Sequence, residues 1–156
     1  MSKRKSPARS AKPDGAGHPA PEDLRAFAPC AGCMSFALRR AARAMSQHYA
    51  KHLRPTGLRG TQFTMLATLV TAGPMPINRM ARRLGLERTT LTRNLRPLEA
   101  KGWIVVKEDD DRRVHMVSVT EKGRAMARAA LPAWHKAQAT ARAKLKEMRL
   151  DALLAA

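Results

Sequence analysis

Arginine and threonine side chains recur in one short segment, RTTLTRNLR, which runs from Arg88 to Arg96. A guanidinium group can fork onto a guanine edge in a DNA major groove, and a threonine can reach a phosphate or touch a thymine methyl group. The alternative is an ordinary solvated basic face. On a helix, which turns by about 100° per residue, the candidate DNA-reading residues are Thr89, Thr92, Arg93 and Arg96, which lie opposite Leu91, together with the adjoining Arg88 and Thr90.

The densest acidic cluster of the chain stands beside two arginines. Four consecutive acids, Glu108–Asp111, precede Arg112 and Arg113 in a chain whose formal charge is +18. An isolated carboxylate near phosphate opposes DNA binding, whereas one that accepts hydrogen bonds from an arginine fixes the direction of that side chain. Aspartates also favour tight turns. The residues alone therefore leave four roles open for these acids, namely orientation of an arginine, turn formation, weakening of indiscriminate binding to the DNA backbone, and plain solvation.

Two cysteines, Cys30 and Cys33, have the CxxC spacing. A thiol at a helix N-terminus can be reactive, so the pair is a candidate redox site; the alternative is packed or idle cysteines. No further ligands at zinc spacing accompany the pair, and His48 and His52, four residues apart, lack a third ligand nearby in sequence. The sequence also has no nucleophile elbow, glycine-rich phosphate loop or carboxylate pair. We therefore predict no catalytic residues, no metal, no cofactor and no enzymatic activity.

Charge and length narrow the class of partner. The 156 residues suit one domain with a tail. Thirty Lys and Arg oppose twelve Asp and Glu, and residues 24–86 contain no acid, which predicts an anionic partner. Aromatic residues make up only 4%, which argues against a membrane-surface helix, and no apolar run approaches the roughly 20 residues that span a bilayer. We expect a cytoplasmic protein that binds nucleic acid and not membranes.

The elements that must position these side chains are mainly helical. Residues 1–29 contain five prolines and two glycines and predict a disordered basic tail. Apolar residues at every third or fourth position predict a helix over Cys30–Leu53 and a second one over Thr61–Val70. The segment TAGPMP then punctuates the chain with Gly and Pro.

Ile77–Gly102 is the most informative segment. Apolar side chains at helical spacing predict a short first helix, and Gly85 supplies its left-handed stop. A second helix begins near Glu87 and ends at Gly102, and we expect Pro97 to bend it. Two short helices around a tight glycine turn are typical of a helix-turn-helix. The alternative is a plain helical hairpin with a solvated basic face.

Segments rich in β-branched residues, WIVVK and VHMVSV, flank the acidic cluster and predict a two-stranded β-hairpin. Thr120 is the expected N-cap of a long final helix, and we expect Pro132 to kink or divide that helix. A helix-turn-helix, a hairpin and a further helix in this order predict a winged helix-turn-helix. The fold class is mainly α with a small β-hairpin wing.

The order of these elements closely resembles the MarR family of bacterial transcriptional regulators over about residues 30–150. The resemblance rests on the segments LGLERTTLTRNLRPLEAKGWI, DDDRRVHMVSVTEKG and LRPTGLRGTQFTML. It implies a homodimer with flanking dimerisation helices, which binds a pseudopalindromic double-stranded DNA operator and regulates transcription, most often as a repressor. Its sharpest part is a wing pattern, Asp-x-Arg followed by Val-Thr-x-x-Gly, carried by Asp111, Arg113, Val119, Thr120 and Gly123.

The same resemblance implies roles for single residues. Arg113 enters the minor groove of DNA, and Arg112 contacts at most a phosphate. Asp111 orients the side chains of two arginines, Arg113 in the wing and Arg88 in the lobe. Because the family usually has a longer final helix than MRLDALLAA suggests, we expect either a dimer that relies more on Cys30–Leu53 and Met126–Met148 or a weaker dimer. The implied domains are a dimerisation helix and turn at 30–60, a DNA-binding lobe at 61–120 and C-terminal dimerisation helices at 121–156.

An effector is also implied. Many family members bind small aromatic ligands between the dimer helices and the DNA lobes, and some sense oxidants through a cysteine near the start of the first helix, a place that Cys33 resembles. Two rival functions remain open: a sequence-indifferent architectural DNA-binding protein and a thiol-based redox enzyme. The candidate ligand pocket, for which core packing is the alternative, comprises Met34, Met45, Met65, Met126 and Trp134.

Overall fold

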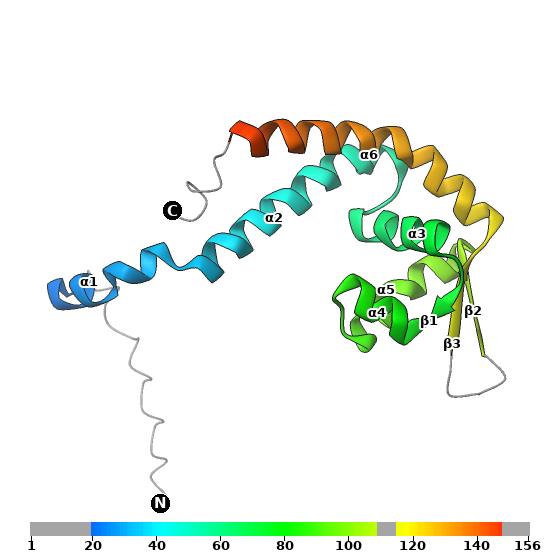
Figure 1. Ribbon diagram of the computed structural model, residues 1–156, viewed down its shortest axis with the longest axis horizontal. Helices are drawn as coiled ribbons and strands as arrows, with labels where there is room; N and C mark the ends of the chain where they lie inside the picture. Colours follow the sequence, from blue (N-terminus) through cyan, green and yellow to red (C-terminus); the bar gives the residue numbers. More distant parts are fainter. Residues whose placement is uncertain (1–19, 109–114, 148–156) are drawn as a thin grey trace, which may run out of the picture.

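The computed structural model describes residues 20–108 and 115–147, with side chains as far as Lys144. This described part is mainly helical and contains one small sheet, as the sequence predicts. In Figure 1, α3, α4, α5 and the sheet form one lobe, while α2 and α6 pack together beside this lobe and diverge away from it. The elements are α1 Pro21–Phe27, the 3-10 helix η1 Ala28–Gly32, α2 Met34–Leu53, the 3-10 helix η2 Arg54–Thr56, α3 Gly60–Ala72, β1 Met75–Pro76, α4 Ile77–Leu84, α5 Arg88–Ala100, β2 Ile104–Glu108, β3 His115–Val119 and α6 Glu121–Glu147.

Aliphatic side chains build the core of the lobe. Leu66 of α3, Met80 of α4 and Leu91 of α5 are completely buried there. Each such side chain contributes about 2 kcal/mol of hydrophobic stabilisation relative to an exposed one. Two aromatic residues, Phe63 and Trp103, are the exceptions, each 5% exposed. The core thus follows from a sequence rich in leucine and poor in aromatic residues.

The sheet has three strands rather than the two predicted. Its order is β1-β3-β2 and both pairings are antiparallel. The wing hairpin pairs Ile104 with Val119, and the extra strand pairs Met75 with Val117. Within TAGPMP the sequence indicated only punctuation, but Met75 is 2% exposed and its burial holds this short segment against β3.

The helix-turn-helix forms where the sequence predicts it. α4 ends at Gly85, which has a left-handed φ of 62°, and the Leu86 amide donates to the Ala81 carbonyl over 2.9 Å. Glycine adopts this conformation without the strain that a Cβ would add. Pro97 lies inside α5, and the helix nevertheless continues to Ala100.

α6 runs as one helix through Pro132, so this proline does not divide it. Figure 1 shows α6 changing direction between its yellow N-terminal part and its orange C-terminal part. A proline inside a helix removes one backbone hydrogen bond and crowds the preceding turn, which accounts for a bend there.

The N-terminal region differs from the prediction in two ways. Residues 21–27, which were expected to lie in a disordered tail, form α1, although none of them is buried. Pro21 at the first helical position and acids at Glu22 and Asp23 favour a helix start there. α2 begins at Met34 and not at Cys30, because the chain passes through η1 and is extended at Cys33.

α2 and α6 are joined by polar contacts as well as by packing. Nε2 of His48 lies 3.0 Å from the Ala137 carbonyl and 3.0 Å from the Thr140 hydroxyl. The Tyr49 hydroxyl donates to the Gln138 side chain. His48 is therefore engaged between the two helices.

Candidate nucleic-acid interface

α5 presents a two-sided surface. Leu91, Leu95 and Leu98 face the core and are at most 2% exposed. On the other side Arg88, Thr89, Arg93 and Arg96 are exposed, whereas Thr90 and Thr92 are half-buried. The Thr92 hydroxyl donates to the Arg88 carbonyl over 2.9 Å, so this hydroxyl is already engaged within the helix. The structure therefore brings the six sequence candidates onto one helix and separates them from the core.

α4 adds cations that the sequence analysis did not select. Arg79, Arg82 and Arg83 are all exposed on this helix. They lie off the stripe of apolar residues that forms the buried face of α4. This position in the helical pattern could have identified them from the sequence as exposed cations. In the described part of the chain the ion pairs are those of Glu121 with Arg124 and Arg128, so no described carboxylate lies within 4.0 Å of an α4 or α5 guanidinium.

The wing strands β2 and β3 stand next to α5. A cavity of about 250 Å³ is lined by residues of both, among them Arg88, Arg96 and His115. His115 is half-buried and was not a sequence candidate, because a single histidine in a strand carries no motif. The three wing candidates Asp111, Arg112 and Arg113 lie outside the described residues.

A larger apolar cavity of about 1000 Å³ lies between α2, α3 and the helix-turn-helix. Met45, Met65 and Trp134 line it, as the sequence-based hypothesis requires. Met34 and Met126 do not: Met34 is 41% exposed on α2, and Met126 packs against the core of the lobe. Sequence reasoning missed the polar groups of this wall, among them Tyr49, Arg54 and Arg59.

The two cysteines lie at the entrance to α2. Both are exposed and both carry free thiols. Cys33 is the N-cap of α2, and its amide donates to the Cys30 carbonyl over 3.1 Å, so one 3-10 turn separates the pair. No group of three or more His, Cys, Asp or Glu in the described segments is placed to hold a metal ion.

The N-terminal arm, which we define as residues 21–45, exposes apolar side chains. Phe27 is 66% exposed, Leu38 59% and Phe36 56%, while Leu53 is the only buried residue of α2. Met34 and Leu38 belong to the apolar stripe predicted from the sequence, yet both are exposed, whereas Ala41 and Met45 of the same stripe are half-buried. No helix in the described ranges is long and apolar enough to cross a membrane.

Comparison with known proteins finds one family and several transcriptional regulators that are similar to this chain. The model of the MarR family matches residues 58–115. The transcriptional regulator MhqR of Bacillus subtilis is 33% identical over 87 residues, which cover 55% of this chain and 60% of MhqR. The transcriptional repressor MprA of Escherichia coli K12 is 38% identical over 88 residues, which cover 54% of this chain and 50% of MprA. The matches thus span between half and three-fifths of these curated relatives.

A solved structure extends the likeness beyond the lobe. The transcriptional regulator MosR of Mycobacterium tuberculosis, crystallised in complex with DNA, superimposes with a TM-score of 0.67 and 40% sequence identity. The alignment covers 71% of this chain and 81% of MosR. A family model that matches the helix-turn-helix, and this level of identity across most of a solved regulator with the same fold, show that the chain belongs to the MarR family.

Proposed function

We propose that this protein is a sequence-specific, double-stranded DNA-binding regulator that acts as a homodimer and represses transcription. The outward face of α5 carries this proposal, because arginine and hydroxyl side chains are exposed there while three leucines anchor the helix in the core. That arrangement fits a major groove. The names of MprA, a repressor, and of MosR, a regulator solved with DNA, support the same function. Such a function places the protein in the cytoplasm.

The exposed arginines of the lobe are suited to different parts of DNA. Arg93 and Arg96, exposed in the middle of α5, are suited to base edges, whereas Arg79 and Arg83 on α4 are suited to phosphates. In the wing, Arg113 reaches the minor groove, oriented by Asp111, and Arg112 lies near a phosphate. These wing roles stay proposals that follow from the family pattern.

The exposed arm supports the dimer. Leu38 and Phe36 face water, and burial of both side chains would add several kcal/mol of hydrophobic stabilisation. A second copy of the chain would cover both and would present two copies of α5 to successive major grooves of a pseudopalindrome. We accordingly propose that residues 30–60 and 121–156 supply dimer contacts and that residues 61–120 supply DNA contacts.

We propose that the cavity of about 1000 Å³ receives a small aromatic effector that carries an anionic group. Phe63, Met65 and Trp134 offer an apolar wall, and Arg54 and Arg59 offer cations. Among the described residues that line the cavity there is no acid. A ligand bound between α2 and the lobe would change the orientation of α2 relative to the lobe. This change would release the DNA.

An oxidant is the second proposed effector, supported by the exposed thiols of Cys30 and Cys33 one turn apart. A hydroperoxide would oxidise one thiol to a sulfenic acid and leave as an alcohol or water. The other thiol would then displace the hydroxyl group as water and form a disulfide. Mass spectrometry of peroxide-treated protein and of the Cys33→Ser variant tests this step: a loss of two hydrogens in the native protein alone supports it.

A salt-dependent titration tests the DNA-binding function. The purified protein is titrated with the duplex from its own upstream intergenic region and with a scrambled duplex of equal length, at about 0.15 M salt. We expect a preference of about a thousandfold for the first duplex, with two chains bound per site. Equal affinity for both duplexes, and for further genomic fragments, would instead indicate a sequence-indifferent architectural protein.

A further inference from the structure

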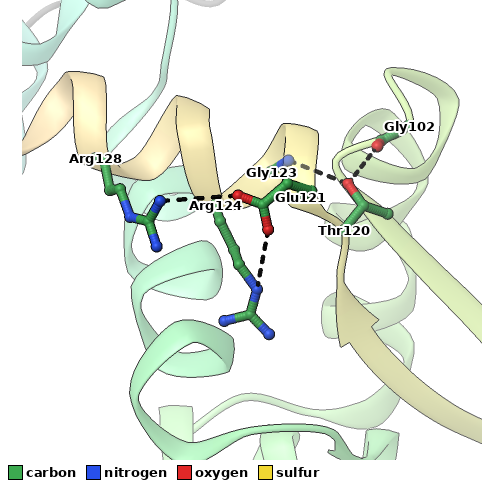
Figure 2. A network of polar contacts seen from close by, with 6 residues as sticks. All are labelled: Gly102, Thr120, Glu121, Gly123, Arg124 and Arg128. Atoms are coloured by element: carbon green, nitrogen blue, oxygen red, sulfur yellow. Dashed lines mark hydrogen bonds and ion pairs between the residues drawn. The ribbon is translucent and has the colours of Figure 1, made fainter.

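Thr120 joins the end of α5, which the proposed function makes the recognition helix for DNA, to the start of α6. Its hydroxyl donates to the Gly102 carbonyl over 2.7 Å and accepts from the Gly123 amide over 3.1 Å, as Figure 2 shows. Its own amide donates to the Trp103 carbonyl over 3.0 Å. We call Gly102, Trp103, Thr120 and Gly123 the Thr120 clasp. One side chain thus bonds to Gly102, eighteen residues earlier in the sequence, and to Gly123 in the first turn of α6.

The near side of the clasp is the C-terminus of α5. The Gly102 amide donates to the Glu99 carbonyl over 2.8 Å, and the Trp103 amide donates to the Leu98 carbonyl over 2.9 Å. With the φ of 67° at Gly102 this is a Schellman closure, which gives the helix a fixed end. Trp103 is 5% exposed, so the turn is anchored in the core. A contact to the Gly102 carbonyl is therefore a contact to a rigid extension of the recognition helix.

The far side is the first turn of α6. Gly123 is buried, and a Cβ built on it would lie 2.0 Å from the Trp103 carbonyl oxygen and 2.9 Å from Cγ2 of Val119. The 2.0 Å obstacle is backbone and cannot rotate away. The close approach explains why glycine stands here, and it presses α6 against the turn that closes α5.

We propose that the Thr120 clasp fixes the orientation of the recognition helix relative to α6 and thereby sets the half-site spacing that the dimer accepts. This inference rests on the proposed dimeric DNA-binding function. α6 packs on α2, which continues into the exposed arm, so α6 belongs to the part that a second copy holds. Any rotation of α5 against α6 would move the two recognition helices of a dimer apart or together. Thr120 is a positioning residue in this scheme and does not itself contact DNA.

The other contacts between α6 and the lobe are less directional than the clasp. Beyond the clasp, α6 meets the lobe through apolar contacts such as the Phe63 and Trp134 rings, whose centroids are 6.0 Å apart. Such contacts are non-directional and allow small rotations, whereas hydrogen bonds at 2.7 and 3.1 Å constrain angle as well as distance.

The first test compares Thr120→Val with Thr120→Ser. Valine keeps the shape and removes the hydroxyl, while serine keeps both hydrogen bonds. Thr71→Val is the matched control, because the Thr71 hydroxyl bonds only within α3. Each protein is titrated with operators whose half-site spacing is native or changed by one base pair. We expect Thr120→Val to lose about fivefold of the preference for native spacing, and the serine and control variants to keep it. An unchanged preference in Thr120→Val, even with a lower melting temperature, would overturn the proposal.

A second test needs no DNA. Spin labels are placed on Glu99→Cys in α5 and Lys136→Cys in α6, both exposed positions, in a Cys30→Ser, Cys33→Ser background. Labelled protein is diluted with unlabelled protein so that distances within one chain dominate. We expect Thr120→Val to broaden or shift the distance distribution relative to Thr120→Ser; superimposable distributions would refute the clasp. If the native protein showed no preference for its operator, the proposed function would be wrong. The spin-label distances would still show whether the clasp fixes the orientation of α5 relative to α6.

Discussion

The lobe and the N-terminal arm differ in how completely they bury their apolar side chains. In the lobe, Leu66, Leu91 and Leu98 are completely buried within a single chain. In the arm, Phe27, Phe36 and Leu38 are each more than half exposed. Both regions show the helical spacing of apolar residues in the sequence. The difference teaches that spacing marks the face to be covered, whereas the tertiary structure decides whether the same chain covers it.

The largest effect is expected from a cavity in the lobe. Leu91→Ala removes a side chain that is 0% exposed and should lower the free energy of unfolding by about 3–4 kcal/mol. The matched change in the arm, Leu38→Ala, should leave the stability of the lobe within about 0.5 kcal/mol of the native value. Thermal denaturation of both variants at low protein concentration measures the contrast. Equal losses would mean that the arm is folded onto its own lobe.

The arm should instead respond through assembly. Leu38→Asp places a charge in the exposed apolar stripe and should weaken the dimer by about 2 kcal/mol, or roughly thirtyfold in Kd. Sedimentation over a concentration series measures this change. Gln47→Asp, an equal charge at an exposed position off the stripe, serves as the control and should have little effect. A dimer that tolerated Leu38→Asp would place the interface elsewhere.

Charge removal should matter on the lobe and not on the arm. Arg93→Ala should weaken operator binding by about 1.5 kcal/mol without lowering stability, because the side chain is exposed on the outward face of α5. Arg39→Ala removes the same charge from α2, where the guanidinium bonds Ser35 of its own helix. Titrations at fixed salt compare the two variants. A similar loss from both would indicate a response to net charge alone.

The smallest effect concerns the acid of the wing. Asp111→Ala should weaken operator binding by about 1 kcal/mol although it makes the protein more basic, because a carboxylate that orients an arginine is lost. Glu22→Ala in the arm changes the charge equally and should not weaken binding. Tighter binding by Asp111→Ala would show that this acid acts only as a repulsive charge.

Local signals account for the parts of the fold that were predicted correctly. Gly85 ends α4 in a left-handed conformation, and the Thr120 hydroxyl caps α6 by accepting from the Gly123 amide. Both features depend on a few neighbouring residues. Strand β1 was missed because Met75 and Pro76 pair with β3, some forty residues further along the chain. No pattern within TAGPMP carries that information.

The candidate sites divide in the same way. The outward residues of α5 follow from helical geometry and one buried stripe, so the sequence was sufficient to place them. The ligand hypothesis named five residues, of which Met45, Met65 and Trp134 line the cavity and Met34 and Met126 do not. Which methionines meet depends on how α2 crosses the lobe. That crossing is set by packing between helices far apart in sequence.

The sequence by itself determined the helix-turn-helix, the hairpin, the face of α5 that carries arginine and threonine, and the basic character that predicts DNA as a partner. Each of these is a local or compositional property. The tertiary structure alone decided that Met34 and Leu38 of the arm stay exposed, that a cavity opens beside Trp134, and that Gly123 lies against the Trp103 carbonyl. Burial, cavities and close backbone contacts arise between distant segments, so they exist only once the elements have packed.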